Sequence, residues 1–449
     1  MSICCRFREK WLCSANRHRN DNKILCFHCR FIVDSGRGAN PKPAFVYNQS
    51  MARHIYIHIP FCAAKCPYCS FYSTIRVEPE FWAAAKKELK IYEELLGARD
   101  DLGRTVGDDD IDTIYVGGGT PSVVDADKLC ELVEETKRVY EIKEEDAEIT
   151  IEANPFSLTA DKAIAYSKAG FNRISIGVQS LDDEVLKTLG RLHDRQKAIE
   201  AIETATDAGF TNISADLMIG IPGQRLEMIK RDADTLISLG VKHISMYSLT
   251  IEEGTPFYKR YSKTLEDLVP QEEERMMYHG LREHLAARGF NPYEISNCAI
   301  EGYESRHNTM YWHGGEYYAI GAGSHGYLDS VRFAHPDDVA LYVRSMADVG
   351  AEDYVRLLKG DCDDIVAIRA LERLTLKDKL HEYAMLMLRT TDGIDRRIFS
   401  EKFGVDAGEV FECAIKENLA RGWLETSGGR IRLTAEGLDF ANAVFADFL

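Results

Sequence analysis

The stretch 55-IYIHIPFCAAKCPYCSFY-72 decides the fold of this chain. It begins with a strand-like run of β-branched residues and then places three cysteines, Cys62, Cys66 and Cys69, in a CxxxCxxC spacing. Thiolates at this spacing can bind one iron-sulfur cube from a single loop, which leaves the fourth iron without a protein ligand. A zinc ion is the alternative, but zinc prefers four ligands, usually in paired CxxC form, and no fourth ligand lies within the loop. We therefore predict a 4Fe-4S cluster.

The composition limits the class of protein. The 449 residues suffice for two or three domains, and 45% of them are hydrophobic, as in an ordinary globular core. No apolar run is long enough for a transmembrane helix or a signal peptide. Twelve cysteines, three of them in one loop, favour a reducing compartment over a disulfide framework. The net charge of -17 disfavours nucleic-acid partners, so we expect a cytoplasmic protein that binds none.

Residues 1–50 form a basic, cysteine-containing extension with nine Lys or Arg residues and three acidic ones. Cys26, His28 and Cys29 could bind zinc, but no second pair follows at zinc-finger spacing. An Arg-rich leader could also be a transit peptide, although this one is poor in serine and has no clear amphipathic helix. We expect instead an upstream extension caused by a misassigned start, with Met51 as the initiator.

Between residues 55 and 255, short apolar runs alternate with longer amphipathic stretches. This alternation predicts a parallel sheet with right-handed helical crossovers, curved into a partial barrel. The predicted strands are 55–60, 113–117, 148–152, 173–178, 212–219 and 243–249. The predicted helices are 81–96, 125–140, 159–169, 194–208 and 226–239.

Glycines and polar residues follow these strands where parallel strands end. In a barrel these ends share one rim, which is where function belongs. The glycines of 117-GGGTPS-122 would let backbone groups approach a ligand without obstruction by a Cβ atom. The polar residues at the other strand ends are Glu152, Gln179, Arg191, His193 and Asp216. Any one of them could be a cap or a loop residue, but five on one rim favour a ligand-binding cradle.

The segments YIHIPFC, GGGTPS, EANP, GVQS, GRLH and DLMIGIPGQ occur in this order. Together they resemble the coproporphyrinogen dehydrogenase (HemN) branch of the radical S-adenosylmethionine (SAM) proteins, and the resemblance covers nearly everything after Met51. It implies that Cys62, Cys66 and Cys69 hold the cluster and that SAM chelates the open iron. The SAM contacts that it implies are Tyr56, Phe71, Gly119, Thr120, Glu152, Gln179, Arg191 and Asp216. Carboxylates suit the amine and ribose hydroxyls of SAM, and Arg191 suits its carboxylate.

Two features separate the chain from the decarboxylating members of that branch. Those members carry a further cysteine two positions after the triplet, where this chain has Phe71. The chain also has an HNxxYW pattern, formed by His307, Asn308, Tyr311 and Trp312. Phe71 and HNxxYW together resemble the HemW-type haem chaperones, in which phenylalanine is more usual at the position of Cys298. The resemblance leaves open whether Cys298 packs inertly or touches haem.

The HNxxYW residues also suggest haem binding by their chemistry. His307 could donate an imidazole nitrogen to haem iron, and the rings of Tyr311 and Trp312 could pack on a porphyrin. The alternative is a buried His-Asn pair in an aromatic core, which the residues alone favour. His325 in GAGSHGY is a second candidate haem ligand, and its alternative is a loop histidine.

The pattern changes near residue 371 to short helices and a closing strand pair around 426-TSGG-429, which is typical of a winged-helix module. Acidic residues outnumber basic ones there, which favours a packing or partner module over a DNA reader. We thus predict an α/β fold: a partial (β/α)6 TIM-like radical SAM barrel with a C-terminal extension and a small winged-helix-like domain. The predicted division is 1–50 for the extension, 51–290 for the barrel, 291–370 for the haem-motif region and 371–449 for the winged-helix-like domain.

The leading hypothesis is a haem chaperone that binds haem, one 4Fe-4S cluster and SAM. Its partners would be acceptor haemoproteins, with respiratory proteins as one class, and transient contact with a membrane protein is compatible with this role. The first alternative is an oxygen-independent coproporphyrinogen III dehydrogenase, which decarboxylates its substrate oxidatively in haem biosynthesis. The second is a radical SAM enzyme that modifies nucleic acid, against which the acidic surface weighs.

Overall fold

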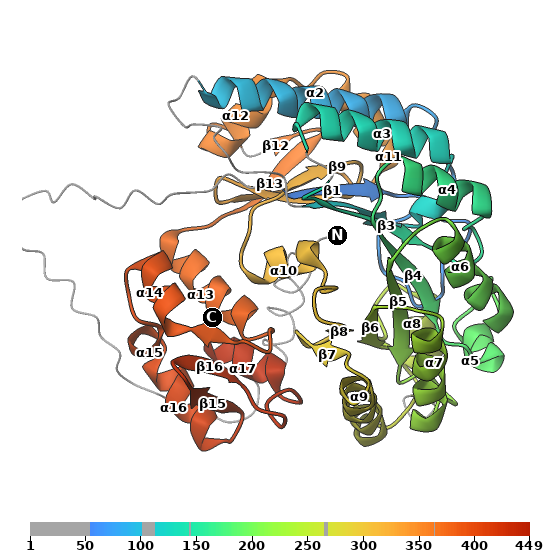
Figure 1. Cartoon of the computed structure of the whole chain (residues 1–449). Coiled ribbons are helices and arrows are strands. Elements are labelled where there is room, and N and C mark those ends of the chain that lie inside the picture. The colour runs from blue at the N-terminus through green and yellow to red at the C-terminus, as the bar shows by residue number, and fades with distance from the viewer. Residues whose placement is uncertain (1–53, 101–112, 143–144, 265–267, 363) are drawn as a thin grey trace, which may run out of the picture.

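A curved nine-stranded sheet forms the centre of the molecule, with strand order β7-β8-β6-β5-β4-β3-β2-β1-β9 (Figure 1). The computed structural model describes residues 54–100, 113–142, 145–264, 268–362 and 364–449. Six parallel strands follow one another in chain order: β1 (His54–Ile59), β2 (Thr113–Gly118), β3 (Glu148–Ala153), β4 (Arg173–Gln179), β5 (Asn212–Ile219) and β6 (His243–Ser248). The predicted partial barrel is confirmed.

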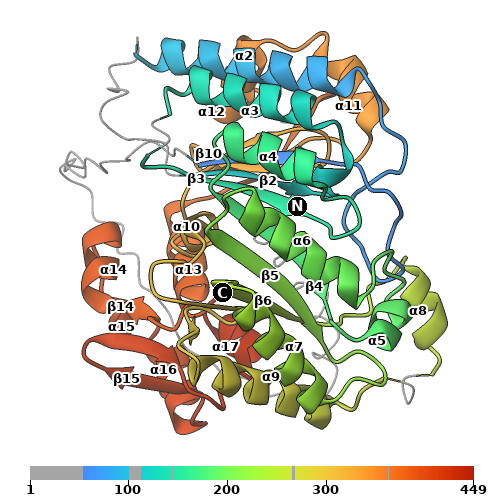
Figure 2. The same ribbon diagram turned by 45° about the vertical axis from the view of Figure 1, so that its right-hand side comes forward.

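Helices cover the outer face of this sheet, as Figures 1 and 2 show. They are α2 (Phe81–Asp100), α3 (Ala126–Val139), α4 (Ala160–Lys168), α6 (Arg195–Asp207), α7 (Leu226–Ser238) and α9 (Gln271–Ala286). Three of the predicted helices begin one residue early, at Asp125, Thr159 and Asp194, because each of these residues is the N-cap. Their side-chain oxygens accept hydrogen bonds from the first-turn amides, which satisfies donors that have no partner within the helix.

Chain segments after residue 290 extend both edges of the barrel sheet. The parallel strand β9 (Tyr318–Ile320) pairs with β1, whereas β8 (Asn297–Ala299) pairs antiparallel with β6 and with β7 (Asn291–Pro292). These strands have two or three residues each, too few to show a period in the sequence, so the sequence analysis missed them. A separate sheet, which is antiparallel, follows in the chain. Its strand order is β10 (His325–Leu328), β11 (Val331–Ala334), β13 (Ile368–Arg373) and β12 (Asp364–Ile365).

A buried carboxylate joins α2 to this extension. Glu88 is fully buried and accepts hydrogen bonds from the hydroxyls of Tyr342 (2.6 Å) and Tyr354 (2.9 Å) and from the amide of Gly321 (3.1 Å). His335 completes the group, with its Nε2 atom 2.7 Å from a Glu88 oxygen. The tyrosines lie on α11 (Val339–Met346) and α12 (Ala351–Lys359), so one side chain fixes four segments of the chain.

The C-terminal residues form a small domain with its own apolar core. Its helices include α13 (Leu376–Met387), α14 (Arg396–Phe403), α15 (Ala407–Val410), α16 (Glu412–Ala420) and α17 (Ala441–Asp447). The strand order is β14 (Ile394–Asp395), β16 (Arg430–Leu433) and β15 (Leu424–Ser427). Gly428 and Gly429 turn the predicted hairpin with positive φ angles of 60° and 80°. The domain therefore has the helices and wing of a winged-helix-like fold.

No helix in the described parts of the chain combines the length and the apolar character needed to cross a bilayer. The predictions for residues 1–50 and for Met51 lie outside the described residues.

Candidate iron-sulfur and SAM site

The three cysteines lie on one loop that leaves the carboxyl end of β1. Cys62, Cys66 and Cys69 are partly exposed and form no disulfide. Thr74 closes the base of the loop: its carbonyl accepts from the amide of Cys62 (2.9 Å), and its amide donates to the carbonyl of Pro60 (2.7 Å). The amide of Cys69 donates to the carbonyl of Cys66 (3.1 Å). The thiols are therefore held in one short, closed loop.

The donor set of this loop fits an iron-sulfur cluster. Burial raises the pKa of the Cys69 thiol, and the charges of Cys66 and Cys62 in the same loop raise it further. Among the described residues, no group of three His, Cys, Asp or Glu side chains is arranged to hold a single metal ion. Three thiols on one loop match the three protein ligands of a cluster whose fourth iron is open.

The glycine-rich segment after β2 packs against the cysteine loop. The amides of Gly119 and Thr120 donate to the carbonyls of Ile59 and Phe61, both at 2.8 Å. A Cβ atom on Gly119 would lie 2.6 Å from the carbonyl oxygen of Phe61, so glycine is required for this approach. The hydroxyl of Thr120 lies 3.5 Å from the sulfur of Cys62. Gly119 therefore permits a close approach to the backbone of the cysteine loop.

Two carboxylates, from the strands on either side of β4, face the same interior: Glu152 lies on β3 and Asp216 on β5. Glu152 accepts from the hydroxyl of Tyr115 (2.8 Å) and from the amide of Gly118 (3.1 Å), while Asp216 accepts from the hydroxyl of Ser175 (3.2 Å). Burial raises the pKa of Glu152 to about 7, and the charge of Asp216 contributes to this increase. Burial also raises the pKa of Asp216. Because both side chains remain partly exposed, they line the open interior of the barrel.

Arg191 connects these groups to the cysteine loop. Its guanidinium donates to the carbonyl of Gly177 (2.7 Å) and lies 3.6 Å from the sulfur of Cys66 and 3.5 Å from the hydroxyl of Tyr68. The Nε atom is buried and has no hydrogen-bond partner in the protein. Gln179 lies beside it with a φ angle of 67°, a left-handed conformation that is rare for a residue with a side chain. An unsatisfied buried donor and a strained neighbour both point to a ligand at this position.

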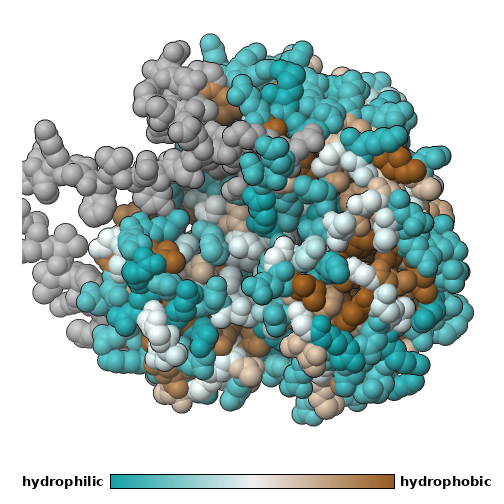
Figure 3. Space-filling model, in the orientation of Figure 1, coloured by the Kyte–Doolittle hydropathy of each residue, from teal (hydrophilic) through white to brown (hydrophobic). Residues whose placement is uncertain are grey.

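The remaining predicted residues of this site lie within β1 and two positions after the last cysteine. Tyr56 is buried in β1, with its hydroxyl 2.9 Å from Nδ1 of His58, whereas Phe71 is 43% exposed. Ile75 and Leu192 are exposed as well, and Gly190 lies against Pro67 of the loop. The cysteine loop is therefore bordered by exposed apolar side chains. Figure 3 shows hydrophobic residues gathered on the right-hand side of the molecule, the side toward which β1 runs in Figure 1.

The HNxxYW segment lies at the other end of the strands, where β1, β2 and β3 begin. Its helix, α10 (Arg306–Trp312), packs on the first residues of β1, β2 and β3. Nδ1 of His307 lies 2.7 Å from the hydroxyl of Thr113, the first residue of β2, and its amide donates to Glu148, the first residue of β3. The six residues of β1 span about 17 Å at a rise of about 3.3 Å per residue. His307 and the cysteine loop are thus separated by the length of the barrel strands.

The side chains of this segment are packed in the protein core. His307, Tyr311 and Trp312 are each less than 5% exposed, and Nε2 of His307 lies 2.9 Å from the hydroxyl of Tyr311. The guanidinium of Arg389, from the C-terminal domain, lies over the Trp312 ring at 4.5 Å. Asn308 is partly exposed. Coordination of iron by Nε2 would therefore require the bond between His307 and Tyr311 to open.

His325 and Cys298, the other residues considered for haem, lie elsewhere. Cys298 is fully buried in the barrel core on β8. His325 begins β10 two residues after Gly323, where a Cβ atom would lie 2.7 Å from the ring of Tyr72 in the cysteine loop. The GAGSHGY segment therefore lies next to the cysteine loop, at the carboxyl ends of the strands, whereas His307 lies at their amino ends.

Several residues of the site were not found from the sequence. Tyr115, His58, Tyr68 and Ser175 each contact a predicted site residue, and Tyr68 lies within the cysteine loop itself. The two-residue period of a strand could have indicated the inward position of His58, since it follows Tyr56 by two residues. No sequence pattern marks the other three.

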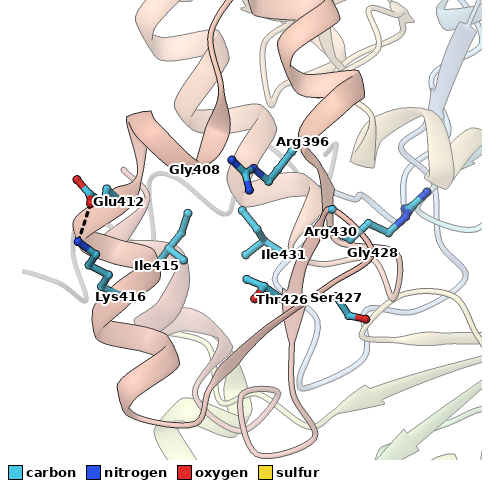
Figure 4. A pocket seen from close by; sticks show the side chains of 11 residues that line it. Arg396, Gly408, Glu412, Ile415, Lys416, Thr426, Ser427, Gly428, Arg430 and Ile431 are labelled. Carbon is cyan, nitrogen blue, oxygen red and sulfur yellow. Dashed lines mark hydrogen bonds and ion pairs between the residues drawn. The ribbon is translucent and has the colours of Figure 1, made fainter.

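A separate pocket of about 380 Å³ lies on the C-terminal domain, between α14, α16 and the wing (Figure 4). Three cations line it, but each is already paired: Arg396 with Asp406 (2.7 Å), Lys416 with Glu412 (2.6 Å) and Arg430 with Asp395 (3.3 Å). The lining therefore presents paired charges and no unsatisfied cation.

Comparisons with known proteins agree with this arrangement. The family model described as the radical SAM superfamily matches residues 56–268, and the HemN C-terminal domain matches residues 374–440. The protein named heme chaperone HemW from Bacillus subtilis (strain 168) is 34% identical, over 88% of this chain and 98% of the relative. The protein of the same name from Escherichia coli (strain K12) is 33% identical, over 88% and 97%.

The solved structure of coproporphyrinogen III oxidase (HemN) from Escherichia coli shares the fold. Its TM-score is 0.70 at 18% sequence identity, and the match covers 89% of this chain and 90% of that one. The family models, the relatives that match almost end to end and the cysteine loop in its barrel lead to one conclusion. The chain belongs to the radical SAM superfamily and, within it, to the HemW family.

Proposed function

We propose that the protein is a haem chaperone that holds one 4Fe-4S cluster and SAM and transfers haem to acceptor haemoproteins in the cytoplasm. The observation that carries the cofactor part is the closed loop of three thiols beside Arg191, whose buried Nε donor lacks a partner. The name shared by the relatives supports the haem part. Anaerobic purification with iron and sulfide analysis, followed by haem titration monitored by visible absorbance, tests both parts.

Different residues of the site would bind the cluster and SAM. Cys62, Cys66 and Cys69 would hold the cluster, which when bound supplies an iron that SAM can chelate. Arg191 would pair with the carboxylate of SAM through its remaining donor, while Glu152 and Asp216 would accept hydrogen bonds from the amine and the ribose hydroxyls. Tyr56, Phe71, Gly119, Thr120 and Gln179 complete the proposed SAM contacts.

An oxygen-independent coproporphyrinogen III dehydrogenase is the second candidate, because the HemN structure shares the fold over nearly the whole chain. Phe71 in place of a further cysteine weighs against it. Anaerobic incubation with coproporphyrinogen III, SAM and a reductant distinguishes the two functions. Catalytic formation of protoporphyrinogen would overturn the chaperone proposal.

Substituting Arg191 with alanine is expected to weaken SAM binding by about tenfold to hundredfold. A hydrogen bond to a charged group contributes about 1.5–3 kcal/mol, and each 1.4 kcal/mol corresponds to about a factor of ten. Calorimetric titration of the anaerobic, cluster-loaded protein measures the dissociation constant. Lys187→Ala is the matched control, since it removes an exposed cation from the neighbouring helix α5 (Asp183–Thr188). An unchanged affinity in Arg191→Ala, at full iron content, would exclude this residue from the SAM site.

Haem affinity is expected to fall tenfold or more in His307→Ala if His307 is the axial ligand, as the HNxxYW resemblance implies. The alanine also deletes two buried hydrogen bonds, so damage to the core has to be separated from loss of a ligand. Tyr311→Phe provides that separation, because it removes the partner of Nε2 and keeps the imidazole. Haem titration should show weaker binding in His307→Ala and undiminished binding in Tyr311→Phe. Weakened binding in His325→Ala alone would instead place the ligand beside the cysteine loop.

A further inference from the structure

Tyr115 occupies a position between the two candidate sites. It lies on β2, and its hydroxyl donates to one oxygen of Glu152 at 2.8 Å. The other Glu152 oxygen accepts from the amide of Gly118 at 3.1 Å, so both oxygens have a fixed partner. A Cβ atom on Gly117 would lie 2.9 Å from both the Glu152 carboxyl and the Tyr115 ring, which shows how closely these groups are packed.

The ring of Tyr115 is held by aromatic neighbours. It stacks on His307 with a centroid distance of 5.0 Å and an interplanar angle of 29°. It also lies in a stacked orientation to Tyr56, at 6.3 Å and 26°. The two ring nitrogens of His307 are bound by Thr113 and Tyr311, so His307 cannot easily turn away from the tyrosine.

We propose that Tyr115 is a positioning residue, which orients the Glu152 carboxylate toward SAM and is itself supported by the ring of His307. The inference extends the proposed function, because it assumes that Glu152 contacts SAM. It also gives the HNxxYW segment a role in the SAM site that does not depend on haem, because the His307 ring packs against Tyr115 and so supports the orientation of Glu152.

The groups around Glu152 make this role measurable. The pKa of Glu152 is raised to about 7, because burial and the charge of Asp216 on β5 together outweigh the hydrogen bond from Tyr115, which lowers it. Tyr247 on β6 also interacts with Glu152, while Arg191 and Arg173 act on Asp216. Since the Tyr115 bond favours the ionised form of Glu152, its removal must raise the pKa of this carboxyl.

The test is the substitution Tyr115→Phe, which keeps the stacked ring and deletes only the hydroxyl. Infrared difference spectroscopy follows the carbonyl stretch of the protonated Glu152 carboxyl as a function of pH, and Glu152→Gln identifies the band. The titration midpoint should rise by about one pH unit, since a hydrogen bond to a charged group contributes at least as much as one unit of pKa. SAM affinity at pH 7 should fall about fivefold, because the ionised fraction of Glu152 would fall from about one half to about one tenth.

Tyr166→Phe is the matched control, since it removes a buried hydroxyl without a hydrogen-bond partner from α4, on the outside of the barrel. It should leave the midpoint and the SAM affinity unchanged. A Tyr115→Phe protein that titrates like the parent would overturn the inference. A parent protein that shows the carboxyl titration and binds no SAM at any pH would overturn the proposed function instead, and the link from Tyr115 to Glu152 would stand.

Discussion

Serine in place of Cys62, Cys66 or Cys69 is expected to abolish the iron-sulfur absorbance of the anaerobically purified protein. The hydroxyl of serine is a harder and far more basic ligand than a thiolate, so it binds iron-sulfur clusters poorly at neutral pH. The loop holds no fourth cysteine that could replace a lost thiol, since the other cysteines of the described residues lie on other segments of the chain. Each single substitution should therefore remove most of the cluster iron and sulfide.

The control for this experiment is Cys413→Ser. Cys413 is an exposed cysteine on α16 of the C-terminal domain. Its substitution should leave the spectrum and the iron content unchanged, and all four variants should retain the far-ultraviolet circular dichroism of a folded barrel. Full cluster occupancy in any of the three loop variants would refute the assignment of the cluster to this loop.

Loss of Glu88 is expected to lower the free energy of unfolding by about 3–5 kcal/mol, the usual result of breaking a buried ion pair from one side. In Glu88→Ala, His335 and the hydroxyls of Tyr342 and Tyr354 lose a common partner in a region without solvent. Denaturant unfolding monitored by circular dichroism measures the change. The double substitution Glu88→Leu with His335→Leu should lower the free energy of unfolding by less, because it leaves no unpaired charge in the core.

The same pair predicts a pH dependence. Burial opposes both charges, but the attraction between the partners outweighs it: the pKa of Glu88 is lowered and the pKa of His335 is raised. The stability that Glu88 contributes is fully present above the pKa of the residue in the unfolded chain, about 4.3. It is lost as the pH falls through the lower pKa of the folded protein. The stability that His335 contributes is fully present below the pKa of histidine in the unfolded chain, about 6.5. It is lost as the pH rises through the higher pKa of the folded protein.

The difference in unfolding free energy between the parent and Glu88→Gln should therefore be largest between about pH 4.5 and pH 6.5. It should shrink at higher pH, as His335 loses its proton in the parent. A difference that stays constant from pH 5 to pH 9 would show that the pair does not carry charge in the folded protein.

The sequence was sufficient to predict the barrel and the cysteine loop because the signals for both are local. Each of the six parallel strands is a short, largely buried run, and its alternation with helices leaves few other topologies. The three cysteines lie within eight residues of one another, so the loop that holds them together follows from spacing alone. Arg191, Glu152 and Asp216 were also predictable as neighbours, since the carboxyl ends of parallel strands meet at one edge.

The tertiary structure decided what depends on contacts between distant segments. From the residues, HNxxYW could either present its rings to a porphyrin or form a buried His-Asn pair in an aromatic core. In the structure, α10 packs against the amino ends of β1, β2 and β3, a strand's length from the cysteines. The position of Tyr115 between His307 and Glu152 joins two strands, β2 and β3, and the helix α10, which follows more than 150 residues after β3. Likewise, nothing in the pattern of α2 marks Glu88 as a buried ion, because its partners follow more than 200 residues later. Local sequence determines which elements form and which residues share a strand end, whereas the burial of a single side chain depends on which distant element packs over it.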